Sequence, residues 1–184
     1  AAADPDRVAV VHGERSWTYR ELDEVTDRVA RALLARGLPA EGIVAVVAER
    51  TLDWAASVLG ILKAGAAYLP LEPHFPPDRI ATVLRRADAR LVLGERGSTA
   101  TLDEALDSLG AAAPERLLVD DAVAEEHGDA VPRVEIAGDR LAYLYFTSGS
   151  TGEPKGAMCE HAGMVNHLYA KIEDLEITEG TVVT

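Results

Sequence analysis

Two continuous apolar runs, residues 43–48 and 66–71, constrain the fold of this chain more than any other feature. A strand without alternating polar residues is typical of a sheet that is covered on both faces. The segment between the runs has the apolar spacing of a helix, with Thr51 placed to cap its start and Gly65 to end it. Strand, helix and strand at this spacing predict a βαβ unit with parallel strands and a right-handed crossover. We therefore expect an α/β fold.

The segments before this unit predict a hairpin followed by a helix. Residues 7–11 and 15–19 alternate between apolar and polar side chains, and residues 12–13, His-Gly, are suited to the turn between them. Thr18 and Glu21 have the spacing of a capping box, in which each residue accepts a hydrogen bond from the backbone of the other. A long amphipathic helix should therefore begin directly after the hairpin.

The segments after the unit continue the alternation of helices and strands. Two prolines at residues 76–77 are suited to the start of a helix, and Thr101 with Glu104 predicts a second capping box. A last helix is expected from about His161 to Asp174. Its apolar residues are expected to point toward the core: Met164, Val165, Leu168 and Ile172. Strands are expected at residues 90–93, 116–119, 141–146 and 177–184, with an irregular acidic segment at residues 120–139.

A loop of small residues separates the strand at 141–146 from a short apolar run at 157–159. Glycines let a backbone approach a ligand closely, and successive N–H groups in such turns form an anion-binding nest. Hydroxyl groups can donate to phosphate oxygens or help to hold Mg²⁺, and a lysine adds a positive charge. The loop therefore predicts a polyphosphate site. Its candidate binding residues are Thr147, Ser148, Gly149, Ser150, Thr151, Gly152 and Lys155.

Two other interpretations of this loop fit less well. A Walker A loop requires Gly-Lys-Ser/Thr five residues after its first glycine, but Pro154 occupies the fifth position after Gly149, and Lys155 is followed by Gly156. A flexible linker would not require apolar strands on both sides or the ending Pro-Lys-Gly.

Three stretches of the chain resemble motifs of the adenylate-forming ligases. Residues 147–156 resemble the phosphate-loop signature of that superfamily. Residues 16–22 and 62–73 are similar to the first and second core motifs of adenylation domains in nonribosomal peptide synthetases, and all three stretches occur in the family's order. Phe146 stands where tyrosine is commoner, and Glu72 where aspartate is commoner. The second motif favours an enzyme that activates amino acids.

This resemblance implies a fold, an activity and partners. Residues 1–184 would form a single incomplete domain, the N-terminal part of a layered α/β/α large subdomain with a mostly parallel sheet. The amino-acid pocket, the hinge and the C-terminal subdomain would be absent, and no catalytic residue is assigned. The parent enzyme would use ATP and Mg²⁺ to convert an amino acid into an aminoacyl adenylate. It would then load the acyl group onto the phosphopantetheine thiol of a carrier protein. The isolated fragment would be inactive.

Two alternatives remain open at this point. The chain could be a piece of an acyl- or aryl-CoA ligase, since the residues that would select the substrate are not in it. It could also be an interaction module, because some adenylation domains bind a small MbtH-like protein near the segment after the second motif. That segment contains Phe75, Pro76 and Pro77.

Charge and cysteine content exclude some functions. A net charge of −13 argues against nucleic-acid binding, and it means that a bound polyanion must be held by local donors. Cys159 is the one cysteine, so no intramolecular disulfide can form, and we expect it to be a small buried strand residue. The five histidines lack the spacing of metal ligands. No apolar run has membrane-spanning length, and the first residues do not resemble a signal peptide, so we expect a cytoplasmic protein.

Overall fold

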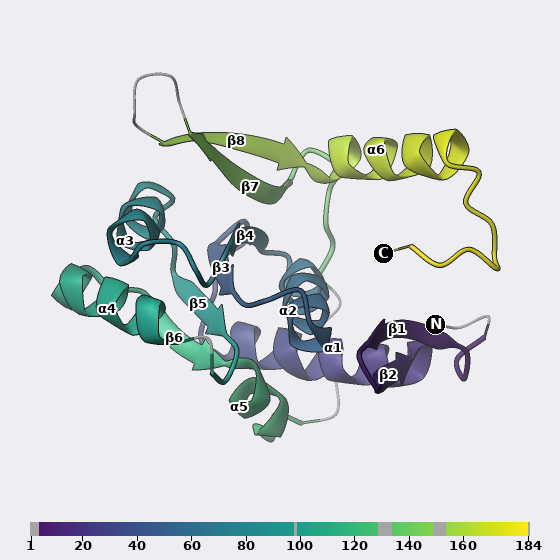
Figure 1. The fold of residues 1–184 in the computed structure, drawn as a ribbon, viewed down its shortest axis with the longest axis horizontal. Coiled ribbons are helices and arrows are strands. Elements are labelled where there is room, and N and C mark those ends of the chain that lie inside the picture. The colour runs from purple at the N-terminus through teal and green to yellow at the C-terminus, as the bar shows by residue number, and fades with distance from the viewer. Residues whose placement is uncertain (1–3, 98, 129–133, 149–153, 184) are drawn as a thin grey trace.

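The computed structural model describes residues 4–97, 99–128, 134–148 and 154–183. Within these residues, six strands form one sheet in the order β6-β5-β3-β4-β7-β8 (Figure 1). β3 runs parallel to β4 and β5, β5 to β6, and β4 to β7, whereas β8 is antiparallel to β7. The predicted α/β fold with a mostly parallel sheet is confirmed. The strands are β3 (Ile43–Val47), β4 (Ala67–Leu71), β5 (Leu91–Gly94), β6 (Glu115–Leu118), β7 (Leu141–Ser148) and β8 (Pro154–Glu160).

Helices cover the sheet on both faces, as the apolar strands require. On one face, α1 (Tyr19–Ala35), α2 (Leu52–Lys63) and α5 (Val119–Ala124) pack against Val44 and Val46 of β3. On the other face, α3 (Pro77–Arg86) and α4 (Ala100–Leu109) pack against Ala45 and Val47 of the same strand. A short 3₁₀ helix, Gly110–Ala112, follows α4. β3 is buried along its whole length, so it is the centre of two apolar cores.

The N-terminal hairpin consists of β1 (Val8–His12) and β2 (Arg15–Thr18), which pair in antiparallel fashion. Its turn is formed by Gly13 and Glu14, because His12 still belongs to β1. The predicted capping box is present: the Glu21 backbone N–H donates to the Thr18 hydroxyl at 3.2 Å, and the Thr18 N–H donates to the Glu21 carboxylate at 2.7 Å. α1 therefore begins directly after the hairpin.

Two predictions for the middle of the chain are wrong. The second capping box does not form, because α4 begins at Ala100 and places Thr101 inside the first turn. The Thr101 hydroxyl instead donates to the carbonyl oxygen of Pro73. The segment at residues 120–139 is not irregular throughout, since α5 includes its first residues and buries Ala122 against the α1 side of the sheet.

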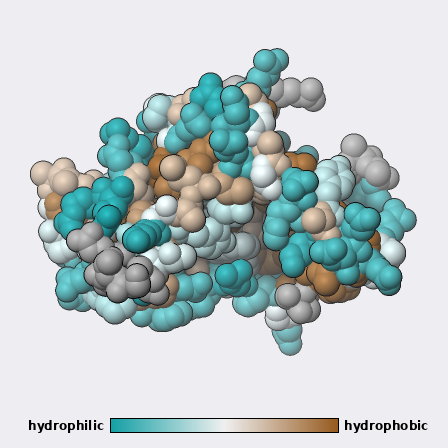
Figure 2. Space-filling view, turned by 90° about the horizontal axis from the view of Figure 1, so that it is seen from above, coloured by the Kyte–Doolittle hydropathy of each residue, from teal (hydrophilic) through white to brown (hydrophobic). Residues whose placement is uncertain are grey.

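Two predictions for the C-terminal part are also wrong. α6 (His161–Asp174) has the expected bounds, but three of the four side chains predicted to point into the core do not: Val165, Leu168 and Ile172 are exposed, and only Met164 is half-buried. Figure 1 shows that α6 extends beyond the end of the sheet. Figure 2, which views the molecule from above, shows hydrophobic residues (brown) on that face of the surface. Residues 177–183 form turns and coil, with no strand. In the described part of the chain, no element buries the rest of that helix face, and residues 177–183 pair with no strand.

In the described residues, no helix is both long and apolar enough to cross a membrane.

Candidate functional site

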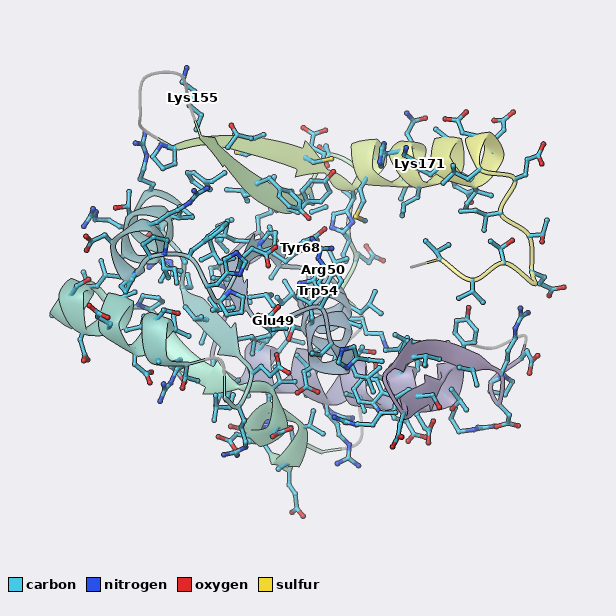
Figure 3. The ribbon with its side chains drawn as sticks, viewed as in Figure 1. Glu49, Arg50, Trp54, Tyr68, Lys155 and Lys171 are labelled. Carbon is cyan, nitrogen blue, oxygen red and sulfur yellow. The ribbon has the colours of Figure 1, made fainter. Side chains whose placement is uncertain are left out.

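The candidate phosphate-binding residues lie around the tip of the β7–β8 hairpin. Thr147 pairs directly with Lys155, and both residues are exposed. Directly opposed residues of an antiparallel pair place their side chains on the same face, so the side chains of Thr147 and Lys155 leave the hairpin side by side. Figure 3 shows Lys155 at the outer end of the hairpin, apart from the other labelled residues. The structure therefore brings together one hydroxyl and one cation of the predicted set.

The other members of the predicted set are described less fully. Ser148 pairs with Pro154 through the backbone. Gly149, Ser150, Thr151 and Gly152 lie outside the residues that the structure describes. Their assignment to the phosphate site stays a prediction from the sequence.

An aromatic ring and a glycine face each other across the root of the hairpin. Phe146 pairs with Gly156, and a Cβ atom at Gly156 would lie 3.2 Å from the Phe146 ring. The ring therefore covers the glycine backbone at close range, in the manner by which aromatic side chains compensate for glycine in a strand. Phe146 also contacts the apolar core on the α3 side of the sheet. This contact anchors the β7–β8 hairpin to the apolar core of the sheet.

Three tyrosines pack together where the hairpin joins the sheet. The ring centroid of Tyr143 lies 5.4 Å from that of Tyr68 and 5.3 Å from that of Tyr145. Tyr68 is buried, and this burial raises the pKa of its phenol above the usual value. A hydrogen bond with the Cys159 thiol, together with burial, raises the pKa of Tyr143 to about 12. The three side chains therefore serve in packing where the hairpin joins the sheet.

β8 and its cysteine differ from the sequence prediction. The apolar run at 157–159 was expected to be a buried strand, but β8 is an edge strand in which Met158 is 73% exposed. Cys159 is half-buried instead of fully buried. Apolar residues on an edge strand remain accessible when nothing covers that edge, and sequence periodicity cannot reveal this.

His161 opens α6 but does not cap it. Glu160 occupies the cap position, and no side chain accepts a capping hydrogen bond there. The backbone N–H of His161 donates to the carbonyl oxygen of Arg140 at 2.8 Å, which ties the start of α6 to the residue before β7. Burial lowers the pKa of the imidazole, and its Nε2 atom has no hydrogen-bond partner among the described residues. His161 therefore contributes to the join between β8 and α6.

A pocket of about 100 Å³ lies beside the root of the hairpin, at the carboxyl ends of β3, β4 and β7. None of the sequence patterns described above predicted this pocket. Arg50 comes three residues after β3, and Glu72 comes directly after β4. The carboxyl ends of adjacent parallel strands meet at one edge of the sheet, so these positions could have indicated the pocket. Figure 3 shows Arg50 and Trp54 close together near the centre of the molecule. The polar and aromatic lining residues are Arg50, Trp54, Glu72, Phe75, Arg79, Tyr145 and Phe146.

Among the described residues, no group of three or more His, Cys, Asp or Glu side chains is arranged to hold a metal ion.

Comparison with known proteins shows the relatives of this chain. Residues 1–183 match the family described as AMP-binding enzyme. Tyrocidine synthase 3 of Brevibacillus parabrevis is 42% identical over 165 residues, which cover 89% of this chain and 2% of the relative. Gramicidin S synthase 2 of Brevibacillus brevis is 35% identical over 184 residues, which cover 97% of this chain and 4% of the relative. The chain thus spans a small fraction of the curated relatives that it matches.

Solved structures show the same fold. The nonribosomal peptide synthetase FmoA3 bound to AMPPNP superposes with a TM-score of 0.80 at 31% identity, over 96% of this chain and 18% of that one. The N-terminal subdomain of NpsA from Klebsiella oxytoca superposes with a TM-score of 0.70 at 29% identity, over 87% of this chain and 39% of that one. The fold is that of the N-terminal subdomain of adenylate-forming enzymes. The chain belongs to the family of AMP-binding enzymes, and its relatives are adenylation modules of nonribosomal peptide synthetases.

Proposed function

We propose that this chain supplies the phosphate-binding hairpin of an enzyme that activates an amino acid with ATP. The reaction joins the amino-acid carboxylate to the α-phosphate and releases pyrophosphate. The aminoacyl group then passes from AMP to the phosphopantetheine thiol of a carrier protein. The remainder of the adenylation domain supplies the amino-acid pocket, the hinge and the C-terminal subdomain.

The observation that carries this proposal is the pairing of Thr147 with Lys155 across the hairpin. A hydroxyl donor beside an ammonium group suits the terminal phosphates of ATP, which present several oxygens and multiple negative charges. The chain carries a net charge of −13, so binding depends on such local donors. Mg²⁺ would arrive with the nucleotide, bound to its phosphate oxygens.

Lys155 has a specific task in this proposal. Negative charge builds up on the leaving pyrophosphate as the bond to the α-phosphorus breaks. A cation held beside that group stabilises the transition state more than the ground state, which accelerates the chemical step. Thr147 orients the same phosphates through its hydroxyl.

The test is amino-acid-dependent ATP–pyrophosphate exchange by a protein that carries this chain together with the rest of an adenylation domain. Thr147→Val and Lys155→Gln should each reduce exchange by about tenfold or more, because each removes one donor to the phosphates. Two exposed residues serve as matched controls. Thr178→Val and Lys171→Gln make the same changes, on the C-terminal segment and on α6, and should leave exchange unchanged. Parental exchange in both hairpin variants would contradict the proposal.

A second candidate function is binding of an MbtH-like protein by the segment before α3. His74 and Pro76 are exposed, while Phe75 is half-buried with its ring 4.3 Å below the Arg79 guanidinium. The stacked ring and guanidinium hold the segment in one conformation, which reduces the entropy lost on binding. This arrangement favours a protein partner at this segment.

A pull-down with a purified MbtH-like protein tests this second function. The chain should retain the partner, and His74→Glu should reduce retention because it places a negative charge beside Phe75, within the proposed contact. His167→Glu, at an exposed position of α6, is the matched control and should bind as well as the parent. Absence of retention at high protein concentration would exclude the interaction.

A further inference from the structure

The pocket at the carboxyl ends of β3, β4 and β7 has features that the hairpin does not explain. Ligands of parallel α/β sheets bind outside the carboxyl ends of the strands, and this pocket occupies that place. Its lining comes from the segment after β3, the start of α2, the loop before α3, α3 itself and β7. Neither Thr147 nor Lys155 lines it. The pocket is therefore separate from the residues that we assign to ATP.

Two guanidinium groups line the pocket, and each is stacked on an aromatic ring. The Arg50 guanidinium carbon lies 5.2 Å from the centroid of the Trp54 ring, and that of Arg79 lies 4.3 Å from the centroid of Phe75. Stacking restrains the plane of a guanidinium group and leaves its N–H donors, which lie in that plane, available to an acceptor. Such a fork is the preferred partner of phosphate and carboxylate oxygens.

The donors in the pocket are incompletely used. Nε of Arg79 is buried and has no hydrogen-bond partner among the described residues. A buried donor without an acceptor is unfavourable. Because this atom has almost no accessible surface, an anion in the pocket would bind the other N–H groups of Arg79. Arg50 is 4.0 Å from the Glu72 carboxylate, and its side chain is 70% exposed. This contact is longer than a hydrogen bond, and a stronger acceptor can replace it.

Size and charge limit the class of ligand. A volume of about 100 Å³ is well below the roughly 300 Å³ at which drug-sized and cofactor sites begin, so a nucleotide does not fit. Two arginines against one glutamate give the pocket a local positive charge in an otherwise acidic chain. We propose that this pocket binds a small phosphate-type oxyanion between Arg50 and Arg79. Inorganic phosphate and pyrophosphate share the required chemistry. If the proposed function holds, the enzyme itself releases pyrophosphate beside this pocket.

The experiment is isothermal titration of the chain with sodium pyrophosphate and, separately, with sodium phosphate, at constant ionic strength and without nucleotide. Saturable binding of at least one anion is expected. Arg50→Gln and Arg79→Gln should each weaken it by about tenfold, the effect of losing one charge-assisted hydrogen bond. Because Arg50 is largely exposed, its replacement leaves the fold intact. Arg90→Gln is the matched control: Arg90 precedes β5 at the opposite edge of the sheet and pairs with Asp88, so affinity should not change.

Glu72→Gln gives a test of opposite sign. It removes the carboxylate that competes for Arg50, so the affinity for the anion should rise severalfold. Tighter binding of pyrophosphate than of phosphate would favour the reaction product as the ligand, and tighter binding of phosphate would favour free phosphate.

Lys155→Gln separates this inference from the proposed function. Anion binding that survives Lys155→Gln and is weakened by Arg50→Gln supports the pocket, whatever the exchange assay shows. Binding that is lost in Lys155→Gln but unaffected in both arginine variants overturns the pocket and leaves the hairpin proposal intact. Failure of the parent chain to bind either anion also overturns the inference.

Discussion

The carboxylate of Glu41 accepts a hydrogen bond from the backbone N–H of Leu141 at 2.8 Å, although the two residues are 100 positions apart in the sequence. Its second oxygen accepts a hydrogen bond from Arg140 at 3.1 Å. Glu41 has a φ of +59°, a conformation that few side chains favour, and its own N–H donates to the carbonyl oxygen of Gly65. One residue thus connects the loop before β3, the turn after α2 and the first residue of β7. It fixes the start of the strand that ends in the candidate phosphate site.

Replacing Glu41 should loosen the start of β7. Glu41→Ala removes both acceptors, so we expect the melting temperature to fall by a few degrees. Glu49→Ala is the control, because the Glu49 side chain follows β3 at the opposite end of the sheet and forms no part of this contact. Differential scanning calorimetry measures the effect. Equal melting temperatures for both variants would contradict the role of Glu41.

The pair of Arg36 and Glu125 should make stability depend on pH in the acidic range. Hydrogen bonds from Arg36, at 2.8 and 2.6 Å, lower the pKa of Glu125 from its usual 4.5 to about 2. Because the pKa is lower in the folded state, the pair stabilises the fold above pH 4.5, and this contribution is lost as the pH falls from 4.5 toward 2.

Glu125→Gln tests this assignment. The substitution should lower the free energy of unfolding at pH 7 and have a smaller effect near pH 3, as measured by urea denaturation at each pH. Glu126→Gln is the matched control, because Glu126 is exposed, adjoins Glu125 in the sequence and forms no hydrogen bond with Arg36. A penalty for Glu125→Gln of equal size at the two pH values would contradict the assignment.

Gly60 sets the distance between α1 and α2. A Cβ atom at this position would lie 2.6 Å from a methyl carbon of Val29 and 3.2 Å from the backbone oxygen of Thr26. Gly60→Ala should therefore cost about 1–3 kcal/mol of stability, even though alanine is the better helix former.

Gly163→Ala is the control for this prediction. Gly163 is also helical, in α6, and its added Cβ would meet the nearest atom, Sγ of Cys159, at 3.4 Å. The substitution should be neutral or stabilise the protein by about 0.5–1 kcal/mol through helix propensity. Chemical denaturation of the two variants measures the change in the free energy of unfolding for each. Stabilisation by Gly60→Ala would show that the helices can separate without cost.

Phe146 should control the order of the hairpin. Its ring covers Gly156 and contacts the core, so Phe146→Ala leaves the root of β7 and β8 without that packing. Amide hydrogen exchange should become faster in β8, while the buried strand β3 keeps its protection and serves as the internal control. Unchanged exchange in β8 would mean that backbone pairing alone holds the hairpin.

Local patterns in the sequence were sufficient for much of the fold. Continuous apolar runs predicted the buried parallel strands β3 and β4, and the spacing of Thr18 and Glu21 predicted the start of α1. The small-residue loop predicted a polyphosphate site, and the structure describes two of its residues, Thr147 and Lys155, as cross-strand neighbours. These features depend on residues that are close in sequence, where propensity, capping and periodicity decide the outcome.

The tertiary structure decided the features that depend on distant partners. Periodicity marks α6 as amphipathic, but whether its apolar face is buried depends on what packs against it, and in the described residues that face is exposed. The hydroxyl of Thr101 does not cap a helix but donates a hydrogen bond to the carbonyl oxygen of Pro73, because the loop that contains Pro73 lies within its reach. Glu41 meets Leu141 because the parallel sheet brings the starts of its strands together, whatever their order in the chain. Arg50 and Arg79 line the same pocket because α3 lies beside the carboxyl ends of β3 and β4. The sequence determined the elements, and the sheet determined which side chains meet.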